Sequence, residues 1–91
     1  MATATLFVRH QVEDYAAWRS VYDEVEDLRQ QYACFGAEVF TSPDDKQDVY
    51  VIHRFPSVEQ AEGFAHSDAL REAMGRAGVI GAPRIEITVE A

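Results

Sequence analysis

Three histidines are the side chains of this sequence best suited to transfer a proton near neutral pH: His10, His53 and His66. A histidine beside a tyrosine hydroxyl can remove an acidic C–H proton and stabilise the enolate that forms, as an aldol-type cyclase or an isomerase requires. The predicted order of elements brings His66 level with His10. We therefore expect His10 and His66, with Tyr22 or Tyr50, to line the polar end of an apolar pocket.

The rest of the expected pocket is mostly aromatic. Its predicted lining residues are Trp18, His53, Phe55, Phe64 and Met74. For each residue taken alone a structural role stays open, because a histidine among strand valines is usually packed and hydrogen-bonded. Aromatic residues at helical spacing are, in the same way, common in protein cores.

Other chemistries lack the residues they need. The histidines are 43 and 13 residues apart, and no His or Cys pair has the spacing of metal ligands. There is no glycine-rich phosphate loop and no dinucleotide-binding motif, so we expect neither a metal nor a cofactor. Cys34 is the single cysteine, which precludes an internal disulfide and fits a reducing cytoplasm.

The elements that must position these residues follow from the apolar pattern. Alternating apolar residues predict four strands, over 3–10, 35–41, 48–55 and 84–90. Three-and-four spacing predicts one helix over 14–32 and a second that Ser57 caps, with a break near His66 and a further segment over 68–76. The sequence therefore predicts an α+β fold: a single ferredoxin-like βαββαβ domain over 1–91, with both helices on one face of a four-stranded antiparallel sheet.

Both faces of the predicted sheet carry apolar side chains. Those expected to face the helices are Leu6, Val8, Val49, Val51, Ile85, Ile87 and Val89. Those expected on the other face are Phe7, Phe40, Tyr50 and Ile52, interspersed with Arg9, Arg54, Glu38 and Glu86. A patch of this kind favours a homodimer through the sheet, although a sheet with one wet face is the simpler alternative. The two arginines would pair with the two glutamates across that interface or clamp an anionic ligand.

Composition limits the partners. Sixteen acidic and eight basic residues give a net charge of −8, which disfavours nucleic acid and anionic membranes. The N-terminus lacks a signal-peptide pattern, and no apolar run approaches the ~20 residues that would cross a bilayer. We therefore expect a soluble cytoplasmic protein.

Three groups of residues resemble a known family: Asp14-Tyr15, Trp18-Arg19 and Tyr22-Asp23 in the first predicted helix, Val49-Tyr50-Val51-Ile52 in the third strand, and Phe64-Ala65-His66-Ser67 in the second helix. The sequence is similar to the antibiotic-biosynthesis-monooxygenase type within the dimeric α+β barrel superfamily. The resemblance implies a homodimer whose two sheets form a barrel, with a pocket in each subunit between sheet and helices. Such relatives include cofactor-free oxygenases of phenolic substrates, haem-degrading enzymes, polyketide cyclases and lactone isomerases.

The sequence departs from that family at the pocket. The oxygenases and haem-degrading relatives use an Asn, a Trp and a His that converge there, whereas this chain has no Asn. Its single Trp18 lies in the first predicted helix, the family's strand position for Trp corresponds to Phe55, and only His66 matches the family's histidine.

Two functions follow from this resemblance. One is a cofactor-free monooxygenase, cyclase or isomerase acting on an aromatic or polyketide-like molecule. The other is a non-catalytic dimeric module that binds a small ligand or has a structural role. A deep pocket that includes His66 and a tyrosine would favour the enzyme, and a pocket filled by Trp18, Phe64 and Met74 would favour the module.

Overall fold

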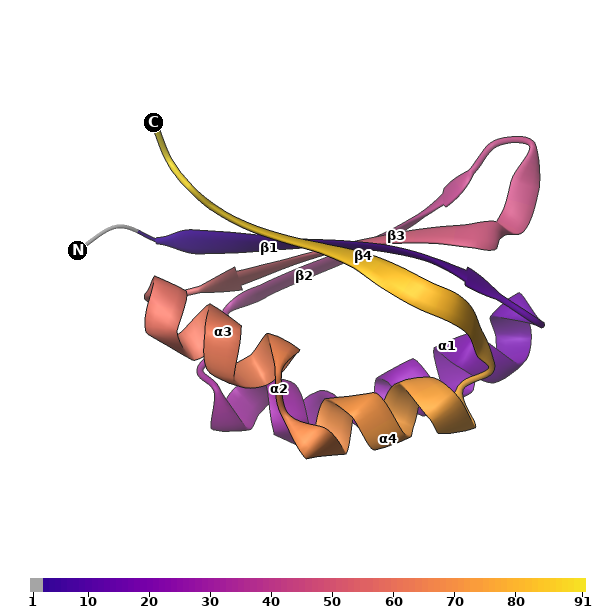
Figure 1. The fold of residues 1–91 in the computed structure, drawn as a ribbon, viewed down its shortest axis with the longest axis horizontal. Coiled ribbons are helices and arrows are strands. Elements are labelled where there is room, and N and C mark those ends of the chain that lie inside the picture. The colour runs from indigo at the N-terminus through magenta and orange to yellow at the C-terminus, as the bar shows by residue number, and fades with distance from the viewer. Residues whose placement is uncertain (1–2) are drawn as a thin grey trace.

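A four-stranded antiparallel sheet, in the order β2-β3-β1-β4, forms one layer of the protein, and four helices form the other. The computed structural model describes residues 3–91. The elements in chain order are β1 (Ala4–Val12), α1 (Tyr15–Glu24), α2 (Glu26–Gln31), β2 (Gly36–Ser42), β3 (Asp45–Phe55), α3 (Val58–Ala65), α4 (Asp68–Arg76) and β4 (Val79–Val89). Figure 1 shows all four helices on one face of the sheet, with the other face uncovered. The predicted α+β, ferredoxin-like arrangement is confirmed.

Alternation along the central strands determines which side chains form the core. In β1, Leu6 and Val8 are buried against the helices, whereas Phe7 and Arg9 point to the uncovered face and are exposed. The expected helix-facing residues are buried or packed against the core, with one exception. Val89, at the end of edge strand β4, is 49% exposed. The core residues that the strands themselves contribute are Ala4, Leu6, Val8, Val12, Val49, Val51 and Phe55.

The helix expected over 14–32 is divided in two at Val25. Asp14 caps α1 by accepting a hydrogen bond from the backbone N–H of Ala17 at 3.1 Å. At the break, the carbonyl of Tyr22 accepts from the N–H of Val25 at 3.3 Å and from Nη1 of Arg29 at 2.8 Å. A side chain that bonds a helix carbonyl in this way is a recognised cause of a break in the hydrogen-bond ladder.

The second predicted helix breaks where the sequence indicated. The hydroxyl of Ser57 caps α3 by accepting from the N–H of Gln60 at 3.2 Å, and His66 is the C-cap residue of that helix. Ser67 then caps α4 through the N–H of Leu70. The predicted cap and the predicted break are both confirmed.

Two strands begin earlier than predicted. β3 starts at Asp45 instead of residue 48, because the turn from β2 is tight. β4 starts at Val79 instead of residue 84, although the strand includes Gly81 and Pro83. The proline is tolerated because β4 is an edge strand. Gly81, with φ of +70°, lies where the pairing of β4 with β1 changes register.

Candidate functional site

A small cavity of about 50 Å³ lies between the sheet and the helices. The strands contribute Val8 and His10 from β1 and Val51 and His53 from β3. The helices and their ends contribute the rest: Trp18, Val21, Tyr22, Val25, Arg29, Phe64, Leu70, Ala73, Met74 and Ala77. The lining is almost entirely apolar apart from two histidines, a tyrosine hydroxyl and one guanidinium.

His53 and Tyr22 form the polar pair of this cavity. Nε2 of His53 and the hydroxyl of Tyr22 are 2.8 Å apart and share a hydrogen bond. Burial, and secondarily the positive charge of Arg29, lower the pKa of His53 to about 4, and burial raises the pKa of the Tyr22 hydroxyl. Both groups are therefore neutral at pH 7, so the pair can donate and accept hydrogen bonds without carrying a charge.

His10 lies at the other end of the cavity and is 6% exposed. Neither of its ring nitrogens has a hydrogen-bond partner among residues 3–91. Burial lowers the pKa of His10, so this imidazole is also neutral at pH 7. A neutral imidazole offers one donor and one acceptor, and here both are free for a bound molecule.

An aromatic row along α1 connects the two ends. The edge of the His10 ring meets Trp18 at 5.6 Å between centroids, and Trp18 stacks on Tyr22 at 4.9 Å. Tyr22 in turn lies parallel to the ring of His53 at 5.8 Å. The row forms because residues 18 and 22 are one helical turn apart and lie on the same face of α1.

The two histidines do not share a proton directly. His10 pairs with Val49 in the sheet register, and His53 pairs with Leu6, four positions along β1 from His10. That offset corresponds to about 13 Å along the strand. Any proton transfer between them must therefore pass through a bound molecule.

The structure brings some predicted site residues together and separates others. Trp18, Phe64 and Met74 line the cavity with His10, His53 and Tyr22. Phe55 is fully buried behind the cavity, where its ring meets His53 at 6.3 Å. His66 is exposed and lines a separate surface groove with Ser67 and Met74, so it does not meet His10.

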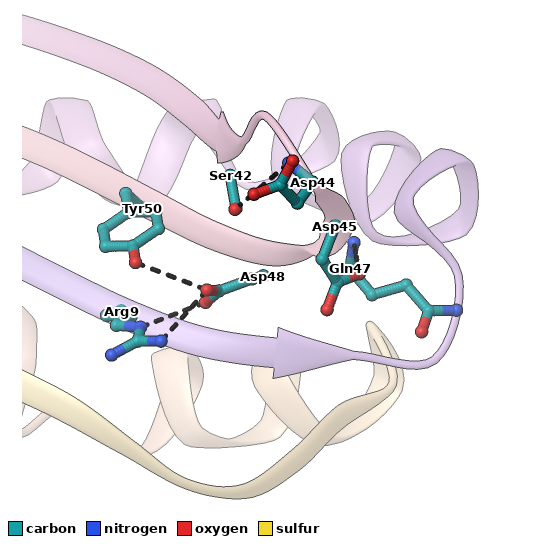
Figure 2. Close-up of polar contacts among 7 residues, drawn as sticks. All are labelled: Arg9, Ser42, Asp44, Asp45, Gln47, Asp48 and Tyr50. Carbon is teal, nitrogen blue, oxygen red and sulfur yellow. Dashed lines mark hydrogen bonds and ion pairs between the residues drawn. The ribbon is translucent and has the colours of Figure 1, made fainter.

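Tyr50 lies on the opposite face of the sheet. Figure 2 shows it beside Arg9 and Asp48, across β1 and β3. Nε and Nη2 of Arg9 donate to the two carboxylate oxygens of Asp48, both at 3.0 Å, and the Tyr50 hydroxyl donates to Asp48 at 3.3 Å. Within one chain Arg9 thus pairs with Asp48, which is not among the partners predicted for it across the sheet interface. Arg54 does pair with Glu38, at 3.3 Å and within one chain.

Sequence reasoning missed Arg29. Its guanidinium carbon lies 4.1 Å from the centroid of the Tyr22 ring, and the residue is buried. The signal was present in the spacing, because residues 18, 22, 25 and 29 continue one three-and-four stripe. A charged residue in a helix rich in acidic residues is expected on the solvent-exposed side. Arg29 instead lies on the apolar, buried side of the helix.

Among residues 3–91, no helix has both the length and the apolar character needed to cross a bilayer. The same part of the chain holds no group of three or more His, Cys, Asp or Glu side chains placed to bind a metal ion.

Comparison with known proteins gives a fold but no sequence relative. No protein-family model and no curated protein matches the sequence. A proposed antibiotic biosynthesis monooxygenase from Bordetella bronchiseptica superposes with a TM-score of 0.83 at 12% identity, covering 100% of this chain and 99% of that chain. SnoaB, a cofactor-independent oxygenase from Streptomyces nogalater, superposes with a TM-score of 0.81 at 9% identity, covering 100% and 95%.

A third solved structure agrees with these two. A proposed antibiotic biosynthesis monooxygenase from Caulobacter crescentus superposes with a TM-score of 0.78 at 14% identity, covering 99% of this chain and 91% of that chain. The chain therefore has the fold of the antibiotic biosynthesis monooxygenase proteins, as its residues suggested.

Proposed function

We propose that this protein is a cofactor-free enzyme that removes a proton from an aromatic or polyketide-like molecule bound between sheet and helices. The observation that carries the proposal is His10, a buried imidazole at the cavity with neither nitrogen hydrogen-bonded to any of residues 3–91. The shared fold with SnoaB, a cofactor-independent oxygenase, supports the same class of chemistry.

The proposed step breaks an acidic C–H bond of the bound molecule. The proton passes to a free nitrogen of His10. The C–H electron pair forms a C=C bond, and the pair of the adjacent carbonyl (the keto tautomer of a phenol) moves onto its oxygen, which becomes an enolate or phenolate. The Tyr22 hydroxyl, when it accepts the Nε2–H of His53, is free to donate its own hydrogen to that oxygen. This step is common to a cyclase, an isomerase and a cofactor-free monooxygenase, the last of which would then pass electrons to O₂.

A second function is favoured by the size of the cavity. Its volume of about 50 Å³ is far below the ~300–1,000 Å³ of pockets that hold larger ligands, and Trp18, Phe64 and Met74 are among its lining residues. An aromatic ring can enter only if the lining moves, and the unbranched Met74 is the side chain best able to do so. A non-catalytic small-ligand module is therefore the alternative.

Hydrogen–deuterium exchange tests the proton step directly. We expect the protein in D₂O to accelerate loss of the ring C–H signals of 1,3-dihydroxynaphthalene, followed by ¹H NMR. Replacing His10 with Gln should reduce the accelerated rate ~100-fold, since positioned proton transfer typically contributes that much. His66→Gln is the matched control, and it should leave the rate unchanged because His66 lies outside the cavity.

Fluorescence separates the two candidate functions. Trp18 is the only tryptophan of the chain and lines the cavity, so its emission reports a bound ligand. Quenching by the naphthalenediol without exchange would favour the binding module. Exchange that persists in His10→Gln but falls in His66→Gln would contradict the assignment of His10.

We propose in addition that the uncovered sheet face joins two copies of the chain. Its support is the set of exposed apolar side chains on that face: Phe7 (42%), Phe40 (49%) and Tyr50 (37%). The charges among them, Arg9 with Asp48 and Arg54 with Glu38, are already neutralised by pairing. An apolar face with paired charges fits a protein contact better than bare solvent.

Light scattering with a matched pair of variants tests the dimer. The wild-type protein should have about twice the 10.2 kDa mass of one chain at micromolar concentration. Phe7→Asp should shift the mass to that of one chain, because it places a charge at the centre of the buried face. Val58→Asp adds the same charge at an exposed position of α3 and should leave the dimer intact. A wild-type mass near 10.2 kDa would refute the proposal.

A further inference from the structure

Arg29 differs from every other arginine of the chain in its charge partners. Six arginines each form an ion pair with a carboxylate at 2.8–3.3 Å: Arg9, Arg19, Arg54, Arg71, Arg76 and Arg84. No carboxylate of residues 3–91 forms such a pair with Arg29, although the chain carries sixteen acidic residues. Within the described part of the chain, the arginine without a carboxylate partner is also the buried one, with 9% exposure.

Such a placement is energetically unfavourable unless something compensates for it. Removing a guanidinium from water costs free energy that a carboxylate normally offsets. Here the protein supplies one hydrogen bond, from Nη1 to the Tyr22 carbonyl at 2.8 Å, and the π face of the Tyr22 ring at 4.1 Å. A guanidinium has five N–H donors, so most of its bonding capacity is left for another group.

The Arg29 side chain lies at the cavity. Arg29 is among the lining residues, together with Tyr22 and His53. The other polar groups of the lining are neutral, as the lowered pKa values of His10 and His53 and the raised pKa of Tyr22 show. The cavity therefore combines aromatic walls with one fixed positive charge, which complements a planar anion.

We propose that Arg29 binds a carboxylate carried by the aromatic ligand, so that the site selects aromatic carboxylates over their neutral analogues. This inference rests on the proposed function, because it concerns the same cavity. In this arrangement the carboxylate pairs with the guanidinium at the Tyr22–His53 end. The ring lies along the aromatic row, toward the free nitrogens of His10.

A matched pair of ligands tests the selection. 3,5-Dihydroxybenzoate and 3,5-dihydroxybenzamide have the same ring and hydroxyls and differ only in the charge of one group. We expect the quenching of Trp18 emission at pH 7 to give about tenfold tighter binding of the benzoate, the gain of one charge-assisted contact. Arg29→Gln should remove this preference by weakening the benzoate alone, and Arg29→Lys should keep part of it.

Arg19→Gln is the matched control variant. It removes the same charge from a guanidinium that also lies near the Tyr22 ring, at 5.4 Å, but Arg19 is half-exposed, pairs with Asp23 and does not line the cavity. The preference for the benzoate should persist in this variant. Circular dichroism of each variant tells a folded protein from an unfolded one, and the wild-type comparison decides the question if Arg29→Gln does not fold.

The outcomes separate this inference from the proposed function. Equal wild-type binding of the benzoate and the benzamide would overturn the role of Arg29 while leaving a cavity that binds phenols. Equal weakening of both ligands by Arg29→Gln would also overturn it, since the guanidinium would then contact a group that both share. Binding of neither ligand, with no proton exchange in 1,3-dihydroxynaphthalene, would refute the proposed function as well.

Discussion

Phe55→Ala should lower the free energy of unfolding by about 3–5 kcal/mol, the usual cost of removing a large buried aromatic side chain. Phe55 is fully buried and packs against Phe64 at 5.4 Å and His53 at 6.3 Å. Truncation therefore removes contacts with both rings and leaves a void that β3 and α3 cannot close without moving. Urea denaturation, followed by circular dichroism at one fixed protein concentration, measures the change.

Phe35→Ala is the control for that experiment. Phe35 is 60% exposed, so the same truncation should change the free energy of unfolding by no more than about 0.5 kcal/mol. A loss below 1 kcal/mol in Phe55→Ala would show that the neighbouring side chains repack easily. Phe55 would then belong to an adaptable ligand pocket, as the family resemblance suggested, and not to the fixed core behind it.

Acidification from pH 7 to pH 4 should cost the protein about 3 kcal/mol of unfolding free energy through His53 alone. The pKa of His53 is about 4 in the folded protein, against 6.5 as the ordinary value, because the ring is buried beside Arg29. Between these two values the unfolded chain binds a proton that the folded chain does not. Stability therefore increases with pH across this window and is lost as the pH falls through it.

Two other groups, His10 and Asp48, also lower the free energy of unfolding as the pH falls. Burial also lowers the pKa of His10, so its protonation favours the unfolded chain as well. The hydrogen bonds from Arg9 hold the pKa of Asp48 below its ordinary value, and that contribution is lost only at more acidic pH. The steep dependence of the unfolding free energy on pH above pH 4 is therefore due to the two buried histidines.

Variants identify the residue responsible. His53→Gln should flatten the profile between pH 4 and pH 6.5, whatever its effect on stability at pH 7, because the titrating group is gone. His66→Gln changes an exposed histidine and should leave the profile as it is. A profile that stays equally steep in His53→Gln would contradict the assignment of the slope to His53. Unfolding curves at a series of pH values provide the measurement.

The fold was predictable because it depends on local patterns that repeat. The alternation of Leu6 and Val8 with Phe7 and Arg9 determines the two faces of β1, and hydroxyl caps at Ser57 and Ser67 determine where α3 and α4 begin. Each of these signals lies within a few residues of the feature that it predicts. The faces of the strands and the starts of the helices could therefore be predicted without knowing which distant residues are in contact.

The site was only partly predictable, because its chemistry depends on which distant side chains meet. The aromatic stripe of α1 indicated Trp18 and Tyr22, but no local pattern joins Tyr22 to His53, 31 residues away. His66 was expected in the cavity because its helix runs back along the sheet. The break that the sequence did predict places it at an exposed helix end instead. Asp48, hydrogen-bonded to Arg9 39 residues earlier, is a third case of the same kind.

The division of the first helix has a consequence for how the cavity and the backbone affect one another. Arg29, which lines the cavity, also holds the Tyr22 carbonyl through its guanidinium at the bend between α1 and α2. A negatively charged guest would bind the remaining N–H groups of a guanidinium that already holds this carbonyl. Ligand binding in the cavity and the angle between α1 and α2 would then be coupled in one equilibrium. The acidic helix α2, which follows Val25, would shift when a ligand binds.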